Sequence, residues 1–299
     1  MDKQELFEKI SNELENKLHF LDDKPEESIR STINALWFKA AGIPISAERA
    51  SDLPLPDLTD NQKNYLSRLI QMRIENTPLA YITGRQNFMG VDLITDRRAL
   101  IPRKETELLG KKALQISREI SDKEKKIFIM DVCCGSGNLG ITVAYNNPDC
   151  FVFSSDISQE AVELTLENIS LLNLNQRVYA YQGDMMSAFE KDEYLDKFDL
   201  IICNPPYITS SKVQKMDLQI SMNEPLVAFD GGMLGIKIIQ KLVHDAPKFL
   251  KNAGWLVFEV GLGQGQLIQQ LCERTGQFSR IETVMDDSNY IRVISARKS

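Results

Sequence analysis

From residue 127 onward, short apolar runs alternate with helical stretches, and this alternation restricts the fold more than any other feature. Five runs have the length of buried strands, at 127–132, 151–156, 178–184, 198–203 and 255–260. Helical patterns lie between them at 139–146, 159–172 and 235–250, and the segments 280–285 and 290–296 fit a terminal hairpin. Strands that alternate with helices predict a doubly wound, mostly parallel α/β sheet, here with seven strands.

The N-terminal part of the chain follows a different pattern. Apolar residues recur at helical spacing through residues 1–76, and Thr59 with Gln62 fits a capping box at the start of one helix. We therefore expect a small all-helical bundle over 1–76, a hairpin linker over 77–107 and the α/β domain over 108–299. The bundle has surface to spare for recognising a substrate.

Composition narrows the possible functions. The chain has 299 residues, is 43% hydrophobic and 26% charged, and carries a net charge of −7, which argues against tight nonspecific binding to a nucleic-acid backbone. The five cysteines form no C-x-x-C pair and fit buried thiols of a reducing compartment. Two histidines are too few for a multi-histidine metal site, so we expect no metal. With no apolar run of membrane-spanning length and no signal peptide, we expect a cytoplasmic protein.

A glycine-containing loop follows the first predicted strand and opens a helix. Its residues are Asp131, Val132, Cys133, Cys134, Gly135, Ser136 and Gly137. Glycines let the backbone approach a ligand closely, and the helix N-terminus offers free N–H groups. Asp156 ends the second strand, where a carboxylate can accept hydrogen bonds from both hydroxyls of a ribose. Asp184 ends the third strand and could meet an adenine amino group.

The same loop also satisfies the dinucleotide pattern G-x-G-x-x-G, so a nicotinamide or flavin cofactor must be weighed. In dinucleotide enzymes the glycines directly follow the strand and leave room for a pyrophosphate. Here Asp131 and two cysteines intervene, and the carboxylate suits the ammonium of an amino-acid moiety, which favours S-adenosylmethionine. The alternative interpretation of Asp131 and Asp156 is helix capping and loop solvation. With no histidine or lysine beside them, Cys133 and Cys134 fit packing better than nucleophilic chemistry.

The four residues Asn204, Pro205, Pro206 and Tyr207 follow the predicted strand 198–203, at the end where open α/β sheets place their ligands. Proline fixes its own φ, lacks an N–H and keeps the preceding residue out of a helix. An amide side chain, free carbonyls and an aromatic face are thus held at one point. Such a set can grip a planar NH₂ group, although an ordinary Pro-Pro turn closing a strand is the alternative.

Taken together, the motifs resemble the protein-glutamine N5-methyltransferases that modify peptide chain release factors. The matching segments, in chain order, are 78–84 with Phe88, the signature 101–107 with Pro102, Arg103 and Thr106, the motif 204–208, Glu224-Pro225 with Ala228 and Gly231-Gly232, and 259–261 with Gln264-Gly265. A helical domain before the catalytic domain also belongs to the family pattern. Lys104, Cys133, Cys134 and Leu234 depart from it.

The resemblance implies a Rossmann-like class I methyltransferase sheet that uses S-adenosylmethionine. It implies that Asn204 and the Pro205 carbonyl hold a glutamine amide with Pro206 and Tyr207 alongside. The partner would be a release factor, and the methylated residue the glutamine of its Gly-Gly-Gln loop. The residues implied to hold the cofactor are Asp131, Cys133, Cys134, Gly135, Ser136, Gly137, Asp156, Ile157, Asp184, Met185 and Asn204.

Three other functions remain possible at this point. The substrate could be a glutamine of a ribosomal or other specialised protein. The same motif also serves N6 methylation of adenine in nucleic acid, against which the acidic net charge counts. The chain could also be a noncatalytic module that senses S-adenosylmethionine, against which the intact Asn204–Tyr207 motif counts.

Overall fold

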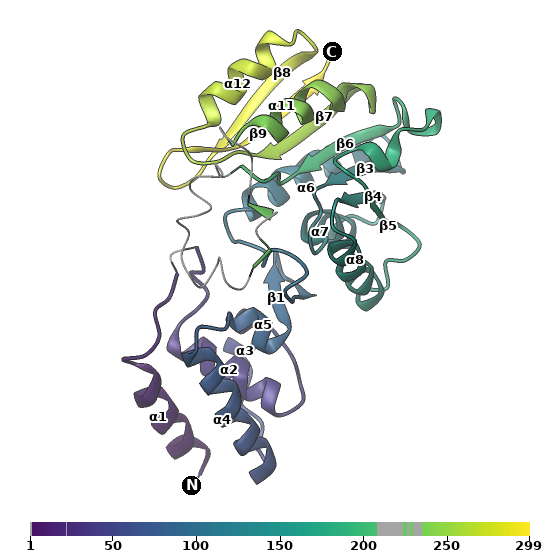
Figure 1. Ribbon diagram of the computed structural model, residues 1–299. Helices are drawn as coiled ribbons and strands as arrows, with labels where there is room; N and C mark the ends of the chain where they lie inside the picture. The colour runs from purple at the N-terminus through teal and green to yellow at the C-terminus, as the bar shows by residue number, and fades with distance from the viewer. Residues whose placement is uncertain (1, 22, 208–223, 226–227, 230–234) are drawn as a thin grey trace. The chain divides into compact units, whose positions relative to one another are not determined.

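The computed structural model describes residues 2–21, 23–207, 224–225, 228–229 and 235–299 (Figure 1). The chain divides into two compact units. Within the described part, the first unit comprises residues 2–97 and 101–104, and the second comprises 98–100 and the residues from Glu105 to the C-terminus. No helix in these described ranges is long and apolar enough to cross a membrane.

The first unit is helical and ends in a hairpin. Its elements are α1 (Lys3–Leu14), α2 (Ile29–Ala40), α3 (Ala47–Ser51), α4 (Asp60–Ile74), α5 (Leu79–Thr83), β1 (Arg85–Phe88) and β2 (Val91–Ile94). Thr59 caps α4 in the predicted capping box with Gln62. The core gathers around Trp37 of α2 and Leu66 of α4. The helical pattern of the sequence did not single out α3 or α5, because five residues are too few to show a helical period.

The second unit carries the sheet, and the predicted seven-stranded doubly wound fold is confirmed. Its strands are β3 (Ile127–Val132), β4 (Cys150–Asp156), β5 (Val178–Gln182), β6 (Phe198–Cys203), β7 (Leu250–Glu259), β8 (Phe278–Met285) and β9 (Ile291–Lys298), in the order β5-β4-β3-β6-β7-β9-β8. The strands from β3 to β7 pair in parallel, and β9 lies antiparallel between β7 and β8. The central strand β6 is buried along its whole length, as its mostly apolar sequence predicts, and its one charged residue, Asp199, is buried as well.

Helices flank this sheet on both faces (Figure 1). They are α6 (Glu107–Ser121), α7 (Asn138–Asn146), α8 (Gln159–Leu171), α11 (Lys237–Asp245) and α12 (Gly265–Arg274), with the short 3₁₀ turns η1 (Ser187–Phe189), η2 (Asp192–Tyr194) and η4 (Ala246–Lys248). The predicted helix 235–250 is shorter than expected, because Pro247 interrupts the α-helical pattern, and the 3₁₀ turn η4 that contains it follows α11. The helix α12 was not predicted at all.

The strand order reverses between β3 and β6. From β3 the chain runs outward through β4 to β5, and then returns to place β6 on the other side of β3. Such a switch point opens a crevice at the C-terminal ends of the two neighbouring strands, which is where open α/β sheets bind their ligands. The fold therefore directs attention to the residues that follow β3, β4 and β6.

Candidate functional site

Strand register brings three of the predicted site segments together. Val132, the last residue of β3, is paired with Ser155 of β4 on one side and with Cys203 of β6 on the other. Cys133 of the glycine loop, Asp156 and Asn204 directly follow these three residues in the sequence. They therefore start side by side at one edge of the sheet, although they are far apart in the sequence.

The glycine loop is tight against helix α7 and open on its other side. Gly135 and Gly137 both have positive φ values, of 56° and 78°. A Cβ on Gly137 would lie 2.6 Å from Ile141 Cδ1 and 2.8 Å from Thr165 Cγ2, so a side chain does not fit there. A Cβ on Gly135 would have Ala99 Cβ, at 3.9 Å, as its nearest neighbour. In the direction of the missing Cβ, the loop is thus open at Gly135, whereas the space at Gly137 is filled by side chains of α7 and α8.

Asp156 fastens this loop to the end of β4. Its Oδ2 accepts a hydrogen bond from the Gly135 N–H at 2.9 Å, and its Oδ1 accepts one from the Ser158 N–H at 3.0 Å. Burial raises the pKa of Asp156, and these N–H donors oppose the rise. The Ile157 N–H is a third backbone donor to this carboxylate. Because a carboxylate has about four acceptor sites, one site remains for a further donor. Ile157 beside it is 56% exposed.

Asp131 is fully buried at the end of β3, beneath the first turn of α7. Its Oδ2 accepts a hydrogen bond from the Gly140 N–H at 2.9 Å, whereas Oδ1 has no hydrogen-bond partner among the described residues. A Cβ on Gly140 would lie 2.7 Å from that Oδ2, so the third glycine of the pattern serves the close packing of α7 on the strand. Burial raises the pKa of Asp131 to about 7, the Gly140 N–H opposes this, and the Asp156 charge adds to it.

This buried carboxyl makes stability depend on pH in a defined direction. The unfolded chain loses the Asp131 proton at a pH near 3.9, but the folded protein holds it until about pH 7. The stabilisation is complete below the unfolded pKa and is lost as the pH rises through the folded one, a change on the order of 4 kcal/mol. In urea unfolding without cofactor, the parent should therefore lose stability relative to Asp131→Asn between about pH 4 and pH 8. Parallel pH profiles for the two proteins would contradict this.

The two cysteines of the loop differ in their surroundings. Cys134 is buried, and burial raises the pKa of its thiol well above the usual value, so the thiol stays protonated and packs. Cys133 is partly exposed and has a φ of 59°, in the left-handed region that a residue with a Cβ seldom occupies. Met185 has a φ of 56°, and its Sδ lies 3.7 Å from Cys133 Sγ. Two strained residues thus meet beside the glycine loop, and such strain clusters at functional sites.

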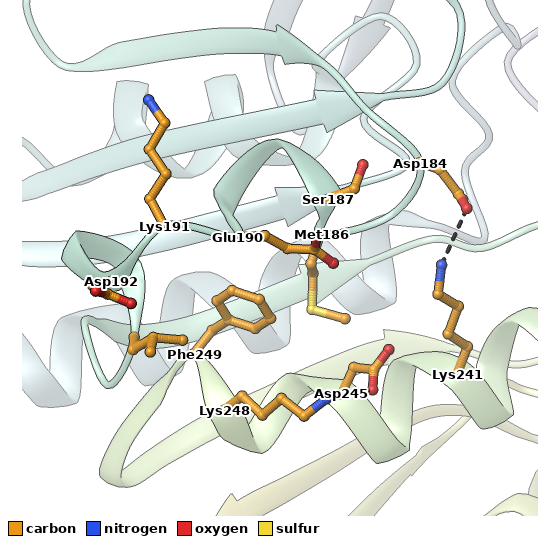
Figure 2. A pocket seen from close by; sticks show the side chains of 11 residues that line it. Asp184, Met186, Ser187, Glu190, Lys191, Asp192, Lys241, Asp245, Lys248 and Phe249 are labelled. Atoms are coloured by element: carbon orange, nitrogen blue, oxygen red, sulfur yellow. Dashed lines mark hydrogen bonds and ion pairs between the residues drawn. The ribbon is translucent and has the colours of Figure 1, made fainter.

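Asp184 lies at the rim of a separate cavity (Figure 2). Its Oδ2 is 3.1 Å from the Nζ of Lys241 on α11, and its side chain is 62% exposed. The cavity has a volume of about 240 Å³, with Met186 and Phe249 among the residues that line it. For Asp184 to meet an adenine amino group, it must use its other oxygen or leave Lys241.

The segment after β6 is held by hydrogen bonds at two side chains. Asn204 Nδ2 donates to Thr106 Oγ1 at 3.2 Å, and the Tyr207 hydroxyl donates to Glu259 Oε1 at 2.9 Å. Burial, followed by the Glu259 charge, raises the pKa of Tyr207 well above its usual value, so the phenol remains a donor. With the NH₂ group of Asn204 on Thr106, no described residue donates to its amide oxygen, which can therefore accept. That oxygen and the Pro205 carbonyl are two acceptors for one NH₂ group.

The Tyr207 ring and backbone are also held from the loop that follows β7. Gln264 Nε2 donates to the Tyr207 carbonyl oxygen at 3.1 Å, and Gln264 Oε1 accepts from the Gly261 N–H at 3.0 Å. A Cβ on Gly261 would lie 2.9 Å from Tyr207 Cδ2. The ring position therefore depends on a glycine at 261.

The other predicted near-site residues fall in different places. Thr106 contacts Asn204, as described above. Phe88, Pro102 and Arg103 belong to the helical unit, where Arg103 Nε pairs with Asp23 Oδ2 at 3.1 Å. Ile208, Gly231, Gly232 and Leu234 lie outside the described residues. In the described ranges, no group of three or more His, Cys, Asp or Glu side chains is placed to hold a metal ion.

Three buried or half-buried polar residues at this edge had no functional assignment from residue chemistry, namely Glu259, Gln264 and Arg292. A signal for Glu259 was present, because it is a charged residue at the C-terminal end of an otherwise apolar strand. Arg292 carries a weaker signal. It lies at the start of the apolar strand β9, and its partner Glu259 is 33 residues away.

Comparison with known proteins places the chain among methyltransferases. Residues 114–224 match the family model of the methyltransferase small domain. The release factor glutamine methyltransferase of Thermodesulfovibrio yellowstonii is 33% identical over 82% of this chain and 85% of its own length. That of Rhodopirellula baltica is 29% identical over 96% of this chain and 95% of its own. Among solved structures, the N-terminal domain of human METTL16 in complex with SAH aligns with a TM-score of 0.52 at 12% identity, over 93% of this chain and 98% of that one, and supports the fold alone.

Proposed function

Because this chain belongs to the release factor glutamine methyltransferase family, we propose that it methylates the side-chain amide nitrogen of a glutamine in a peptide chain release factor. One observation carries the proposal beyond the family relationship. The register of β3, β4 and β6 starts the glycine loop, Asp156 and Asn204 side by side. The residues that we assign to the cofactor are then next to the residues that we assign to the substrate amide, as methyl transfer requires. We call Asn204, Pro205 and Tyr207 the amide clamp.

The cofactor is S-adenosylmethionine, which supplies a methyl group on a positively charged sulfur. The residues fit such a molecule. Gly135 is open on one side, the Asp156 carboxylate has an acceptor site left for a ribose hydroxyl beside its three backbone donors, and Ile157 offers an exposed apolar side chain to a base. Asp131 Oδ1 is a buried acceptor without a partner among the described residues. We assign the remaining contacts to Cys133, Cys134, Ser136, Gly137, Asp184 and Met185.

The residues that hold the glutamine amide, which accepts the methyl group, contribute to catalysis by positioning it. An amide nitrogen is a poor nucleophile because its lone pair is delocalised, and the Asn204–Tyr207 motif contains no general base. Asn204 Oδ1 and the Pro205 carbonyl each accept one N–H of the glutamine, which turns the face of its nitrogen toward the methyl group. Such orientation can lower a barrier by about 7 kcal/mol or more. The Tyr207 ring can stabilise the nearby positive charge by on the order of 1 kcal/mol.

Cofactor affinity should depend on Asp156. In calorimetry, Asp156→Ala should weaken S-adenosylmethionine binding by at least about tenfold, because hydrogen bonds to a charged acceptor contribute about 1.5–3 kcal/mol each. Asp149→Ala is a matched control, since Asp149 directly precedes β4 at its opposite end and pairs with Lys125. Unchanged affinity in a folded Asp156→Ala protein would remove the ribose assignment.

The target is tested by mass spectrometry. A bacterial release factor incubated with the enzyme and S-adenosylmethionine should gain one methyl group on the glutamine of its Gly-Gly-Gln loop. Glycines beside that glutamine leave its backbone unhindered, so it can reach into a recessed clamp. Ribosomal proteins and nucleic acid serve as parallel substrates. Methylation of one of them, with the release factor unmodified, would keep the reaction class and reject this target.

This function implies a role in translation termination and a place in the cytoplasm. The cysteines support a reducing compartment, since all five are free and four of them are buried.

A further inference from the structure

A buried ion pair lies directly behind Tyr207. Glu259, at the end of β7, is 2% exposed, and Arg292 of β9 is 6% exposed. Arg292 Nη2 lies 3.4 Å from Glu259 Oε1, the same oxygen that accepts the Tyr207 hydroxyl at 2.9 Å. Asp286, in the turn between β8 and β9, lies 3.8 Å from the other end of the arginine at Nη1.

Stability gives little reason for an ion pair at this place. Removing two charges from water costs several kcal/mol per ion, and apolar residues of similar volume often serve a core at least as well. The preceding residues of β7, Leu256, Val257 and Phe258, follow that rule and are fully buried. The pair lies where β7 ends, beside the segment that carries the amide clamp. This location points to a role in the site.

Glu259 is linked to Asn204, the other side chain of the amide clamp, through Thr106. Burial raises the pKa of Glu259, and the Thr106 side chain is first among the groups that oppose this rise. Thr106 Oγ1 accepts the hydrogen bond from Asn204 Nδ2, while Glu259 Oε2 is a buried acceptor with no hydrogen-bond partner among the described residues. A hydroxyl has a single proton to donate. With Asn204 donating to its oxygen, Thr106 can direct that proton to Glu259. These contacts from Glu259 through Thr106 fix the orientation of the Asn204 amide, because Asn204 Nδ2 donates to Thr106 and Asn204 Oδ1 remains to accept from a substrate.

We propose that Glu259, with Arg292 as its counter-ion, is a positioning residue that sets the orientation of the Asn204 amide and the Tyr207 ring together. This inference rests on the proposed function, because it concerns how the clamp receives a glutamine amide. Glu259 is buried and acts through its two neighbours. The Glu259 carboxylate orients both Asn204 and Tyr207. When this carboxylate is removed, both side chains lose their alignment.

Kinetics of Glu259→Gln test the proposal. The substitution keeps the size of the side chain and removes its charge, and it should lower kcat at least about tenfold with S-adenosylmethionine affinity unchanged. Thr106→Val should lower kcat similarly, whereas Thr106→Ser, which keeps the hydroxyl, should stay near the parental value. Glu282→Gln on the edge strand β8, whose carboxylate pairs with Lys112 at 2.8 Å, is the matched control and should leave kcat unchanged.

A double-mutant cycle distinguishes a positioning role of Glu259 from a nonspecific loss of structure. If Glu259 acts through the tyrosine, the loss in Glu259→Gln/Tyr207→Phe should be smaller than the product of the two single losses, because residues in one hydrogen-bond network are not additive. Fully multiplicative losses would overturn the direct link to Tyr207. A parental kcat in folded Glu259→Gln would overturn the whole proposal.

A measurement without substrate keeps this inference distinct from the proposed target. In NMR of the free enzyme, the Asn204 side-chain amide protons should exchange with solvent faster in Glu259→Gln and Thr106→Val than in the parent or in Glu282→Gln. Equal exchange in all four proteins would show that the carboxylate does not order Asn204. A parent enzyme inactive on release factor would reject the target, while the exchange result would still decide the role of Glu259.

Discussion

Asn204→Ala should lower methyl transfer to a release factor by at least about 100-fold, the scale expected when a positioning contact is lost. The substitution removes the side-chain oxygen that accepts from the substrate amide, and it also removes the donor to Thr106 Oγ1. Cofactor affinity should stay close to the parental value, because the glycine loop and Asp156 are left intact. Single-turnover transfer of a labelled methyl group, with calorimetry of the cofactor, measures both quantities.

Asn252→Ala is a suitable control for this substitution. Asn252 is exposed near the start of β7, away from the end of the strand where Glu259 lies. Normal turnover by a folded Asn204→Ala enzyme would show that the amide clamp is not the catalytic device. A large fall in cofactor affinity would instead assign Asn204 mainly to cofactor binding.

Removal of residues 1–97 should abolish methylation of a full-length release factor and spare cofactor binding. We propose that the helical unit recognises the protein substrate, because Asp131, Asp156, Asn204 and Tyr207 all belong to the other unit. That unit has its own buried core, built around residues such as Phe198, Leu256 and Ile294. A cut after residue 76 is less suitable, since Leu79 and Ile82 would lose the helical core in which they pack.

Calorimetry of the truncated protein is the internal control, because retained affinity for S-adenosylmethionine shows that the sheet has folded. Parental activity of the truncated enzyme on whole release factor would show that the helical unit has another role. Lost affinity would show that the sheet depends on the helical unit for its own structure.

Local sequence pattern predicted much of the sheet. The bounds of β3 and β6 agree with their predicted ranges, because each is a short, mostly apolar run that follows a lysine and leads into a turn-forming segment. The same pattern located the glycine loop after β3 and the Asn204–Tyr207 segment after β6. The short helices α3 and α5 escaped prediction, since five residues span little more than one helical turn.

The tertiary structure decided which of these segments meet. Strand order and register start Cys133, Asp156 and Asn204 side by side, and no local pattern specifies the neighbours of a strand. The tertiary structure also decided the surroundings of Asp131. The sequence pattern placed this residue near a ligand, and the structure shows that it is buried beneath α7. Glu259 and Arg292 pair because β9 turns back between β7 and β8. Neighbours along the chain determine a strand or a turn, whereas a buried charge finds its partner only once distant strands have packed.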